Sequence, residues 1–202
     1  MIKDTIAMKD NISDEIWRKT SLGDICNIIP GQSPSSDTYR KEPAGLPFFQ
    51  GKADFGLINP VPRTWCVSPI IIALPGDILI SVRAPVGPTN IANVECCIGR
   101  GLAAIRGKEN ICIDFIHSAL KFCENKLASL GSGSTFSSIS MKQLASLEIY
   151  LPSFAEQKRI AVILKEQLAA VEKARKAAKE KLEVIEQLPM ALLRKAFCEN
   201  LK

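Results

Sequence analysis

The feature that most constrains this 202-residue chain is a stretch near its C-terminus, residues 153–188, that contains no glycine and no proline. Strong helix formers (alanine, leucine, glutamate, lysine and glutamine) dominate it. Apolar residues recur in it at steps of three or four, which is the spacing of one stripe on a helix. The stripe consists of Ile160, Leu164, Leu168, Val171, Ala174, Ala178, Leu182, Ile185 and Leu188.

A helix over residues 153–188 would be roughly 54 Å long, at about 1.5 Å per residue. That length exceeds what a preceding domain of some 150 residues can cover, so the stripe needs a partner helix. No other stretch of the chain predicts a helix of that length, and we expect an antiparallel coiled coil with the same helix of a second copy. The alternative is a single amphipathic helix that folds back on its own domain. The expected dimer interface is Ile160, Leu164, Val171, Ala174, Ala178, Leu182 and Ile185.

The two ends of this helix carry recognisable signals. Ser153 is placed to cap the first turn, and Glu156 follows three residues later, as in a capping box. Pro189 removes a backbone donor and restricts Leu188, so the sequence predicts a kink there. A short final helix is expected over residues 190–200. The predicted domains are therefore 1–152 and 153–202.

Composition narrows the class of protein. The net charge is +5; residues 1–150 carry 15 Lys and Arg against 14 Asp and Glu, and residues 151–202 carry 11 against 7. This balance permits nucleic-acid binding without requiring it. The chain has no run of eighteen apolar residues and no signal peptide, so we expect no membrane span. Seven irregularly spaced cysteines and a single histidine, His117, favour a reducing cytoplasm and argue against a zinc site.

The first 152 residues are rich in predicted strands, with few helices and no alternating βαβ pattern, which predicts an α+β domain with a curved, mostly antiparallel sheet. Strands are expected near Phe48 and Phe49 and over residues 70–74, 78–82 and 144–151. A helix is expected over 114–128, with Phe115, Leu120, Phe122 and Leu127 inward and His117 on its surface. Polar loops are expected over 30–41, over 83–90 with Thr89 and Asn90 near the tip, around the glycine-flanked Arg100, and over 131–140.

Several of these stretches resemble one family. They are Trp17 with Leu22-Gly-Asp-Ile, Gly76-Asp-Ile-Leu-Ile-Ser, Gly133-Ser-Thr-Phe, Leu151-Pro-Ser-Phe-Ala-Glu-Gln-Lys-Arg-Ile and Leu188-Pro-Met-Ala-Leu-Leu-Arg-Lys-Ala-Phe. Together they resemble the DNA specificity subunits of type I restriction-modification systems, in the same order along nearly the whole chain. The Leu-Pro entry to the long helix is the most specific of these signals.

The resemblance implies a target-recognition domain followed by a long helix, in a chain that is half of a typical subunit. It implies double-stranded DNA as ligand, and modification (methyltransferase) and restriction subunits as partners. S-adenosylmethionine, ATP and Mg²⁺ are expected only on those partners, with no cofactor or metal here. Glu156, Gln157 and Arg159 are the expected docking residues for the methyltransferase; capping and surface ion pairing are their alternative roles.

On this interpretation the DNA face is formed by loops of the first domain. Lysines would contact phosphates, whereas arginine and asparagine could read guanine and adenine. Arg83 and Arg100 could instead pair with Asp77 or Glu95 and brace the loops. The candidates are Arg40, Lys41, Lys52, Arg83, Thr89, Asn90, Arg100, Ser134, Thr135 and Ser138.

Two rival functions stay open at this stage. One is a coiled-coil adaptor that never touches DNA. The other is a self-contained DNA-modifying enzyme. That enzyme would need a carboxylate cluster with a nearby lysine, or a cofactor loop with an Asn-Pro-Pro-aromatic signature, and the sequence presents neither.

Overall fold

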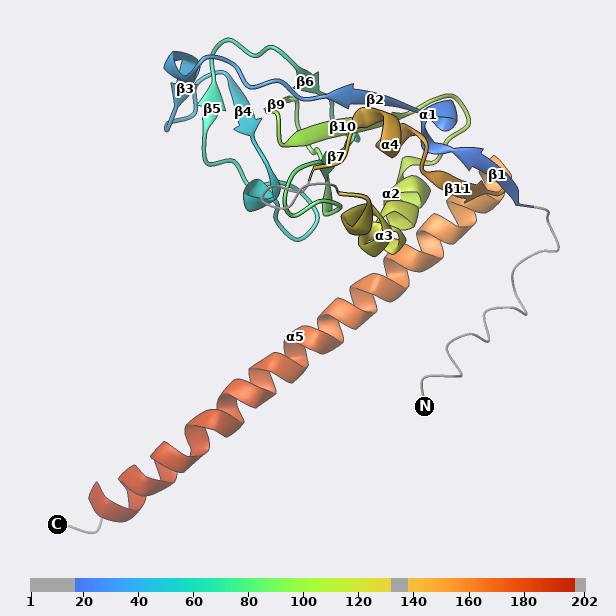
Figure 1. Ribbon diagram of the computed structural model, residues 1–202. Helices are drawn as coiled ribbons and strands as arrows, with labels where there is room; N and C mark the ends of the chain where they lie inside the picture. The colour runs from blue at the N-terminus through green and yellow to red at the C-terminus, as the bar shows by residue number, and fades with distance from the viewer. Residues whose placement is uncertain (1–16, 132–137, 199–202) are drawn as a thin grey trace. The chain divides into compact units, whose positions relative to one another are not determined.

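The computed structural model describes residues 17–131 and 138–198. It divides into two compact units, the first ending at Ala161 and the second beginning at Val162. The first unit combines strands and helices, which confirms the predicted α+β class (Figure 1). Within the described residues, the second unit consists of the rest of one long helix, α5 (Phe154–Cys198).

The strands form three sheets, and every pairing is antiparallel except that of β4 with β9. The first sheet pairs β1 (Arg18–Ser21) with β11 (Glu148–Leu151). The second has the order β2 (Cys26–Pro30), β10 (Leu102–Gly107), β7 (Ile78–Ser81), β8 (Thr89–Ile91). The third has the order β3 (Tyr39–Arg40), β5 (Trp65–Cys66), β4 (Leu46–Phe49), β9 (Cys96–Ile98), β6 (Ile72–Ala73). The mostly antiparallel character is therefore confirmed, but it is spread over three sheets.

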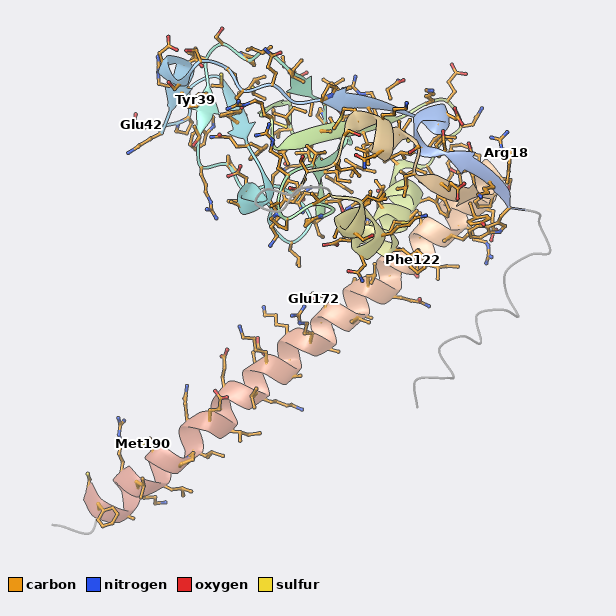
Figure 2. The ribbon with its side chains drawn as sticks, viewed as in Figure 1. Arg18, Tyr39, Glu42, Phe122, Glu172 and Met190 are labelled. Carbon is orange, nitrogen blue, oxygen red and sulfur yellow. The ribbon has the colours of Figure 1, made fainter. Side chains whose placement is uncertain are left out.

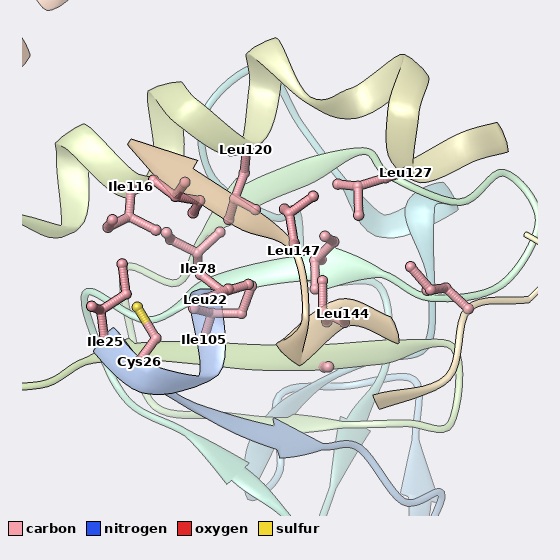
Figure 3. Close-up of a cluster of buried hydrophobic side chains, with 14 of the residues drawn as sticks. Leu22, Ile25, Cys26, Ile78, Ile105, Ile116, Leu120, Leu127, Leu144 and Leu147 are labelled. Carbon is pink, nitrogen blue, oxygen red and sulfur yellow. The ribbon is translucent and has the colours of Figure 1, made fainter. Parts of the chain in front are cut away.

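The main hydrophobic core packs helices against one face of the second sheet (Figure 3). The helices are α1 (Leu22–Ile25), α2 (Ile113–Phe122), α3 (Glu124–Leu130) and α4 (Met141–Ala145). Ile78 and Ile80 of β7 face this core, whereas Leu79 between them faces a second cluster around Phe49 and Ile98. Both faces of β7 are thus buried, because successive side chains of a strand point to opposite sides. This explains its uninterrupted run of apolar residues.

Residues 114–128 do not form one helix, as the sequence predicted. The helix ends at Phe122, and α3 begins at Glu124. At about 100° per residue, a continuous helix would place Phe115 and Leu127 about 120° apart; the break allows both to reach the core. Phe122 is 90% exposed instead of buried, because it follows the buried Leu120 by two residues and lies on the opposite face.

His117 lies in the interior and not on the helix surface, with only 8% of its area exposed. Burial lowers the pKa of its imidazole to about 4, since desolvation disfavours the charged form. The side chain is therefore neutral at pH 7. Its Nε2 atom has no hydrogen-bonding partner among the described residues.

Two predicted strands are shorter than the sequence indicated. Only Ile72–Ala73 of the segment 70–74 is a strand, β6, which lies at the edge of the third sheet. Ile70 and Leu74, on either side of it, are 49% and 37% exposed. The segment 144–151 begins as the end of α4, so its strand starts only at Glu148.

The long helix begins as the sequence predicted. The backbone N–H of Glu156 donates to Ser153 Oγ at 3.4 Å, so Ser153 caps the first turn. The expected separate final helix is wrong, because α5 continues as one helix of 45 residues with Pro189 inside it. A proline removes one internal hydrogen bond. The residues around it form helices readily enough to continue the helix through that position.

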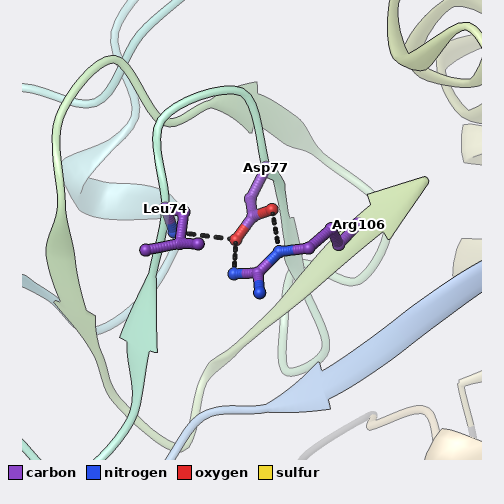
Figure 4. A network of polar contacts seen from close by, with 3 residues as sticks. All are labelled: Leu74, Asp77 and Arg106. Atoms are coloured by element: carbon purple, nitrogen blue, oxygen red, sulfur yellow. Dashed lines mark hydrogen bonds and ion pairs between the residues drawn. The ribbon is translucent and has the colours of Figure 1, made fainter. Parts of the chain in front are cut away.

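A buried ion pair fixes the turn before β7 to strand β10 (Figure 4). Asp77 is 3% exposed, and its carboxylate accepts hydrogen bonds from Arg106 Nε at 2.8 Å and Arg106 Nη2 at 2.7 Å. It also accepts from the backbone N–H of Leu74 at 2.8 Å. The carboxylate raises the pKa of the Arg106 guanidinium, mainly through the hydrogen bond. Asp77 thus accepts hydrogen bonds both from the Arg106 guanidinium and from a backbone N–H of the turn.

We predict that Asp77→Ala lowers the free energy of unfolding by roughly 2–4 kcal/mol, because it leaves a half-buried guanidinium and a backbone donor without their acceptor. Urea denaturation of the full chain at fixed concentration measures this. Lys19→Ala is the control: it breaks the ion pair with Glu148, whose two side chains are both about half exposed. Water screens that pair, so its loss should change stability far less. Equal losses for the two variants would contradict this account of Asp77.

Candidate nucleic-acid interface

Three of the predicted DNA-contacting cations line one pocket of the first unit. They are Lys52, Arg83 and Arg100, which are far apart in the sequence and come from three different loops. The pocket has a volume of about 220 Å³. Its lining contains no acidic residue and consists of Ser33, Gln50, Gly51, Lys52, Ser81, Arg83, Ala84, Arg100 and Gly101. Such a lining is electropositive and offers several hydrogen-bond donors to an anion or a base edge.

Arg100 occupies the tight turn between β9 and β10. The backbone N–H of Arg100 donates to Ser33 Oγ at 3.2 Å, and that of Gly99 donates to the carbonyl of Phe49 at 2.8 Å. A Cβ atom at Gly101 would clash with the carbonyl oxygen of Gln50. Gly101 is therefore needed for close packing of the chain's own backbone, and Gly99 packs against the side chains of Ser33 and Phe48, whereas the sequence suggested close approach of a ligand.

Arg83 follows β7 and is braced on two sides. Ser81 Oγ donates to the carbonyl of Arg83 at 2.9 Å. Arg83 also pairs with Ser138 in an isolated antiparallel bridge, next to the bond from Ile139 N–H to the Val82 carbonyl at 3.0 Å. Pairing with Asp77, one of the two bracing roles considered for Arg83 and Arg100, is wrong because Arg106 occupies that carboxylate.

Lys52 begins the short 3-10 helix η3 (Lys52–Asp54). Asp54 at the end of η3 turns its carboxylate back to the chain and accepts from the N–H groups of Gln50 at 2.7 Å and Gly51 at 3.4 Å. The one acidic residue of this turn is thus engaged with the backbone. Lys52 itself is exposed.

Arg40, Lys41 and Ser138 are exposed but do not line this pocket. Arg40 Nη1 donates to two nearby carbonyls, those of Asp37 at 2.7 Å and Tyr39 at 2.8 Å. Ser134 and Thr135 lie outside the described residues. The exposed, described members of the predicted set therefore divide into three cations that line one pocket and three residues that do not, of which Ser138 pairs with Arg83.

Thr89 and Asn90 cannot be surface contacts for DNA, because they lie in β8 with 8% and 2% of their area exposed. The Asn90 side chain accepts from the N–H of Gly56 at 3.0 Å and donates to the carbonyl of the same residue at 3.1 Å. The sequence showed a polar pair near a loop tip, but the pairing of β8 with β7 carries both residues inside.

Sequence reasoning missed three polar residues of the pocket: Ser33, Gln50 and Ser81. Ser33 belongs to the proline-rich loop 30–41 that was expected to be functional. Gln50 follows the buried strand residue Phe49 directly and precedes a glycine, a pattern that marks a strand end. The sequence gives no reason to assign Ser81 to a binding site, because it ends an apolar strand; in the structure it is 2% exposed.

Two of the three predicted docking residues, Glu156 and Gln157, are buried. Gln157 is 1% exposed; its side chain accepts from the N–H of Cys112 at 2.9 Å and donates to the carbonyl of Pro152 at 3.0 Å. Glu156 is 8% exposed and accepts two bonds from Arg159, at 2.7 and 2.6 Å, which lower the pKa of its carboxyl. Gln157 therefore fastens α5 to α2, whereas the Arg159 side chain is 43% exposed.

We predict that Gln157→Leu lowers the free energy of unfolding by roughly 2–4 kcal/mol, because it leaves one buried N–H and one buried carbonyl unpaired. Gln187→Leu, on the exposed surface of α5, is the matched control and should change stability little. Urea denaturation of both variants gives the comparison. A Gln157→Leu variant of unchanged stability that loses only partner binding would restore the docking interpretation.

Within residues 17–131 and 138–198, no helix is long and apolar enough to cross a membrane. The same residues contain no group of three or more His, Cys, Asp or Glu side chains arranged to hold a metal ion.

A family model described as the type I restriction modification DNA specificity domain matches residues 14–183 of the chain. The chain belongs to this family. It is 44% identical over 182 residues to a putative type I restriction enzyme specificity subunit, MjaX, of Methanocaldococcus jannaschii, covering 89% of this chain and 43% of that protein. It is 24% identical over 194 residues to the MjaIX specificity subunit of the same organism, covering 91% and 44%.

Solved structures of specificity subunits share the fold. The HsdS subunit from Thermoanaerobacter tengcongensis superposes with a TM-score of 0.73 at 44% identity, over 94% of this chain and 46% of that one. A second match is a chain from a structure that concerns the complex assembly and conformational transition of a type I restriction-modification system. It gives a TM-score of 0.80 at 43% identity, over 97% of this chain and 50% of that one. The chain thus spans about half the length of these relatives.

Proposed function

We propose that this chain recognises double-stranded DNA for a type I restriction-modification system, with the pocket of Lys52, Arg83 and Arg100 at the centre of the DNA-binding face. The supporting observation is the convergence of three cations from separate loops into one pocket without a carboxylate. At about 220 Å³ the pocket has room for roughly seven waters. That size suits a phosphate group or a base edge.

Each cation can take a distinct part in recognition. Lysine is a compact charge that binds phosphate, which positions the duplex without reading it. Arginine can place two parallel donors on O6 and N7 of guanine, and each such pair discriminates by about 1–3 kcal/mol. Both arginines are candidate readers, because the backbone of Arg100 is held by Ser33 and that of Arg83 by Ser81 and Ser138. A fixed backbone lowers the entropic cost of binding.

The test is a set of alanine substitutions at Lys52, Arg83 and Arg100, measured by gel shift against a duplex selected from a random library and against random duplex. Loss of a phosphate contact should weaken both complexes and reduce the slope of log K against log salt by about 0.9. Loss of a base-reading arginine should weaken the selected complex preferentially.

Arg18→Ala is the control, because Arg18 is exposed but does not line the pocket. Variants at all three pocket positions that bind both duplexes like the unaltered chain would contradict the proposed face. An unaltered chain that binds no duplex in low salt would favour the coiled-coil adaptor instead.

We also propose that the chain acts without catalytic activity of its own, in a complex with modification and restriction subunits that hold S-adenosylmethionine, ATP and Mg²⁺. Membership of the specificity family supports this assignment. The exposed guanidinium of Arg159, anchored by Glu156, is the remaining candidate contact for the modification subunit. Methyl transfer from S-adenosylmethionine to DNA by the purified chain alone would favour the self-contained enzyme.

The second unit supports a homodimer through α5. Val171, Leu182 and Ile185 are 63%, 54% and 60% exposed, and the small residues Ala174 and Ala178 lie between them on the same side. Figure 2 shows side chains such as Glu172 and Met190 standing out from this helix. Ile160 is not part of the proposed interface, because it packs against the main core of its own domain. Leu164, partly buried, begins the remaining stripe.

We predict that Val171→Asp with Ile185→Asp converts the dimer to a monomer at micromolar concentration, because each aspartate would be buried without a partner. Light scattering of the full chain measures the mass. Ala169→Asp with Gln187→Asp is the control: it adds the same two charges about 160° around the helix from Val171 and Ile185, and the dimer should persist. An unaltered chain that is monomeric under these conditions would rule out the homodimer.

A further inference from the structure

A rigid turn beside the cationic pocket carries two exposed aliphatic side chains. The turn comprises residues 56–59, in which Leu57 is 72% and Ile58 is 56% exposed. Large apolar side chains at the tip of a turn keep an unfavourable contact with water and gain no packing in the free protein. Their exposure therefore points to a contact made with a ligand.

The turn is held by more hydrogen bonds than a plain connection needs. The buried Asn90 side chain binds both the N–H and the carbonyl of Gly56, and Gly56 N–H also lies 3.1 Å from the Asn59 carbonyl. Asn59 Nδ2 donates to the carbonyl of Ile91 at 2.8 Å, and Ile91 N–H donates to the carbonyl of Ile58 at 2.9 Å. The backbone on both sides of Leu57 is thus fixed to strand β8. The tip of the turn can therefore keep its conformation when it contacts a ligand.

The turn is connected to η3, the element that carries Lys52 of the cationic pocket. Leu57 follows Lys52 by five residues, so their Cα atoms are at most about 18 Å apart. The bond from Val61 N–H to the carbonyl of Asp54 at 2.8 Å closes the base of the turn onto η3, the element that carries Lys52. Because base pairs are spaced about 3.4 Å apart along a strand, the Cα separation of Leu57 and Lys52 corresponds to at most about five base-pair steps, to which the reach of the two side chains adds.

The charge around the turn favours a nucleic acid as the ligand. No acidic residue occurs between Asp54 and Asp77, whereas Arg63 lies in that segment. Asp54 is already engaged by backbone N–H groups, and Asp77 by Arg106. An apolar tip without carboxylates in its own segment can approach a phosphate backbone without like-charge repulsion.

We propose that Leu57 and Ile58 form an apolar wedge that enters between neighbouring base pairs of the duplex bound at the cationic pocket. Aliphatic side chains inserted in this way partly unstack a base step and kink the duplex. Side chains that unstack base pairs need a rigid backbone behind them. The hydrogen bonds of Asn90, Asn59 and Ile91 make the backbone of this turn rigid. The wedge rests on the proposed DNA-binding function and adds a sequence preference through easily unstacked steps.

The experiment uses the full chain and a duplex selected from a random library, with 2-aminopurine in place of adenine at successive positions. Fluorescence of this base rises when its stacking is lost. Binding of the unaltered chain should raise the signal at one step. Leu57→Ala with Ile58→Ala should abolish that rise and weaken binding by roughly tenfold to a hundredfold, since two buried aliphatic contacts disappear. The salt slope should stay unchanged, because no charge is removed.

The matched control is Val67→Ala with Ile70→Ala, two aliphatic residues of another loop that are 47% and 49% exposed. This variant should bind and unstack DNA like the unaltered chain. Circular dichroism and urea denaturation check that both double variants fold.

Three results would overturn the wedge: no rise in fluorescence at any position, full affinity of the Leu57/Ile58 variant, or a loss that disappears when thymine is replaced by deoxyuridine. The last result would assign the tip to a thymine methyl group. In each case a reduced salt slope for Lys52→Ala would leave the proposed function standing. Failure of the unaltered chain to bind any duplex would remove both.

Discussion

The close backbone packing around residues 98–102 is the constraint on which the rest of the first domain depends. Four connections meet there. The N–H groups of Gly31 and Gln32 donate to the carbonyls of Leu102 and Ile98, Gly99 N–H donates to Phe49, and Val82 N–H donates to Gly101. These bonds join β2, β4 and β7 to the turn between β9 and β10, so that the second and third sheets share one junction. Glycine is required because a Cβ at Gly31 or Gly101 would clash with a carbonyl oxygen.

The same junction explains why the cationic pocket exists. Lys52 follows β4, Arg83 follows β7 and Arg100 lies in the turn itself. Three strand ends that are tied to one turn necessarily carry their side chains to one place. The cations gain no mutual stabilisation there, and like charges repel. All three side chains are exposed, so water screens much of that repulsion, and an anionic ligand bound there would be attracted by all three.

Buried polar side chains hold three connections of the first unit in place. Asp77 fixes the turn before β7 through Arg106, Asn90 fixes the 56–59 turn, and Gln157 fixes the start of α5 to α2. Each is at most 3% exposed and bonds to backbone groups as well. A polar group of this kind is stable inside only when its partners are in place. The 56–59 turn is consequently rigid at the proposed contact with DNA, which reduces the ordering cost of binding.

The sequence by itself determined the parts of the protein that depend on local periodicity and on matched motifs. The capped helix from Ser153, the buried Phe48 and Phe49, the glycine-flanked Arg100, the α+β class and the specificity family all follow from spacing or motif. The tertiary structure alone decided which polar residues face outward. Asn90, Gln157 and His117 had surface or contact roles in the sequence interpretation but are buried, because strand pairing and helix packing set exposure through residues remote in the chain. The pocket shared by Lys52, Arg83 and Arg100 arises for the same reason, since only non-local contacts bring three separate loops together.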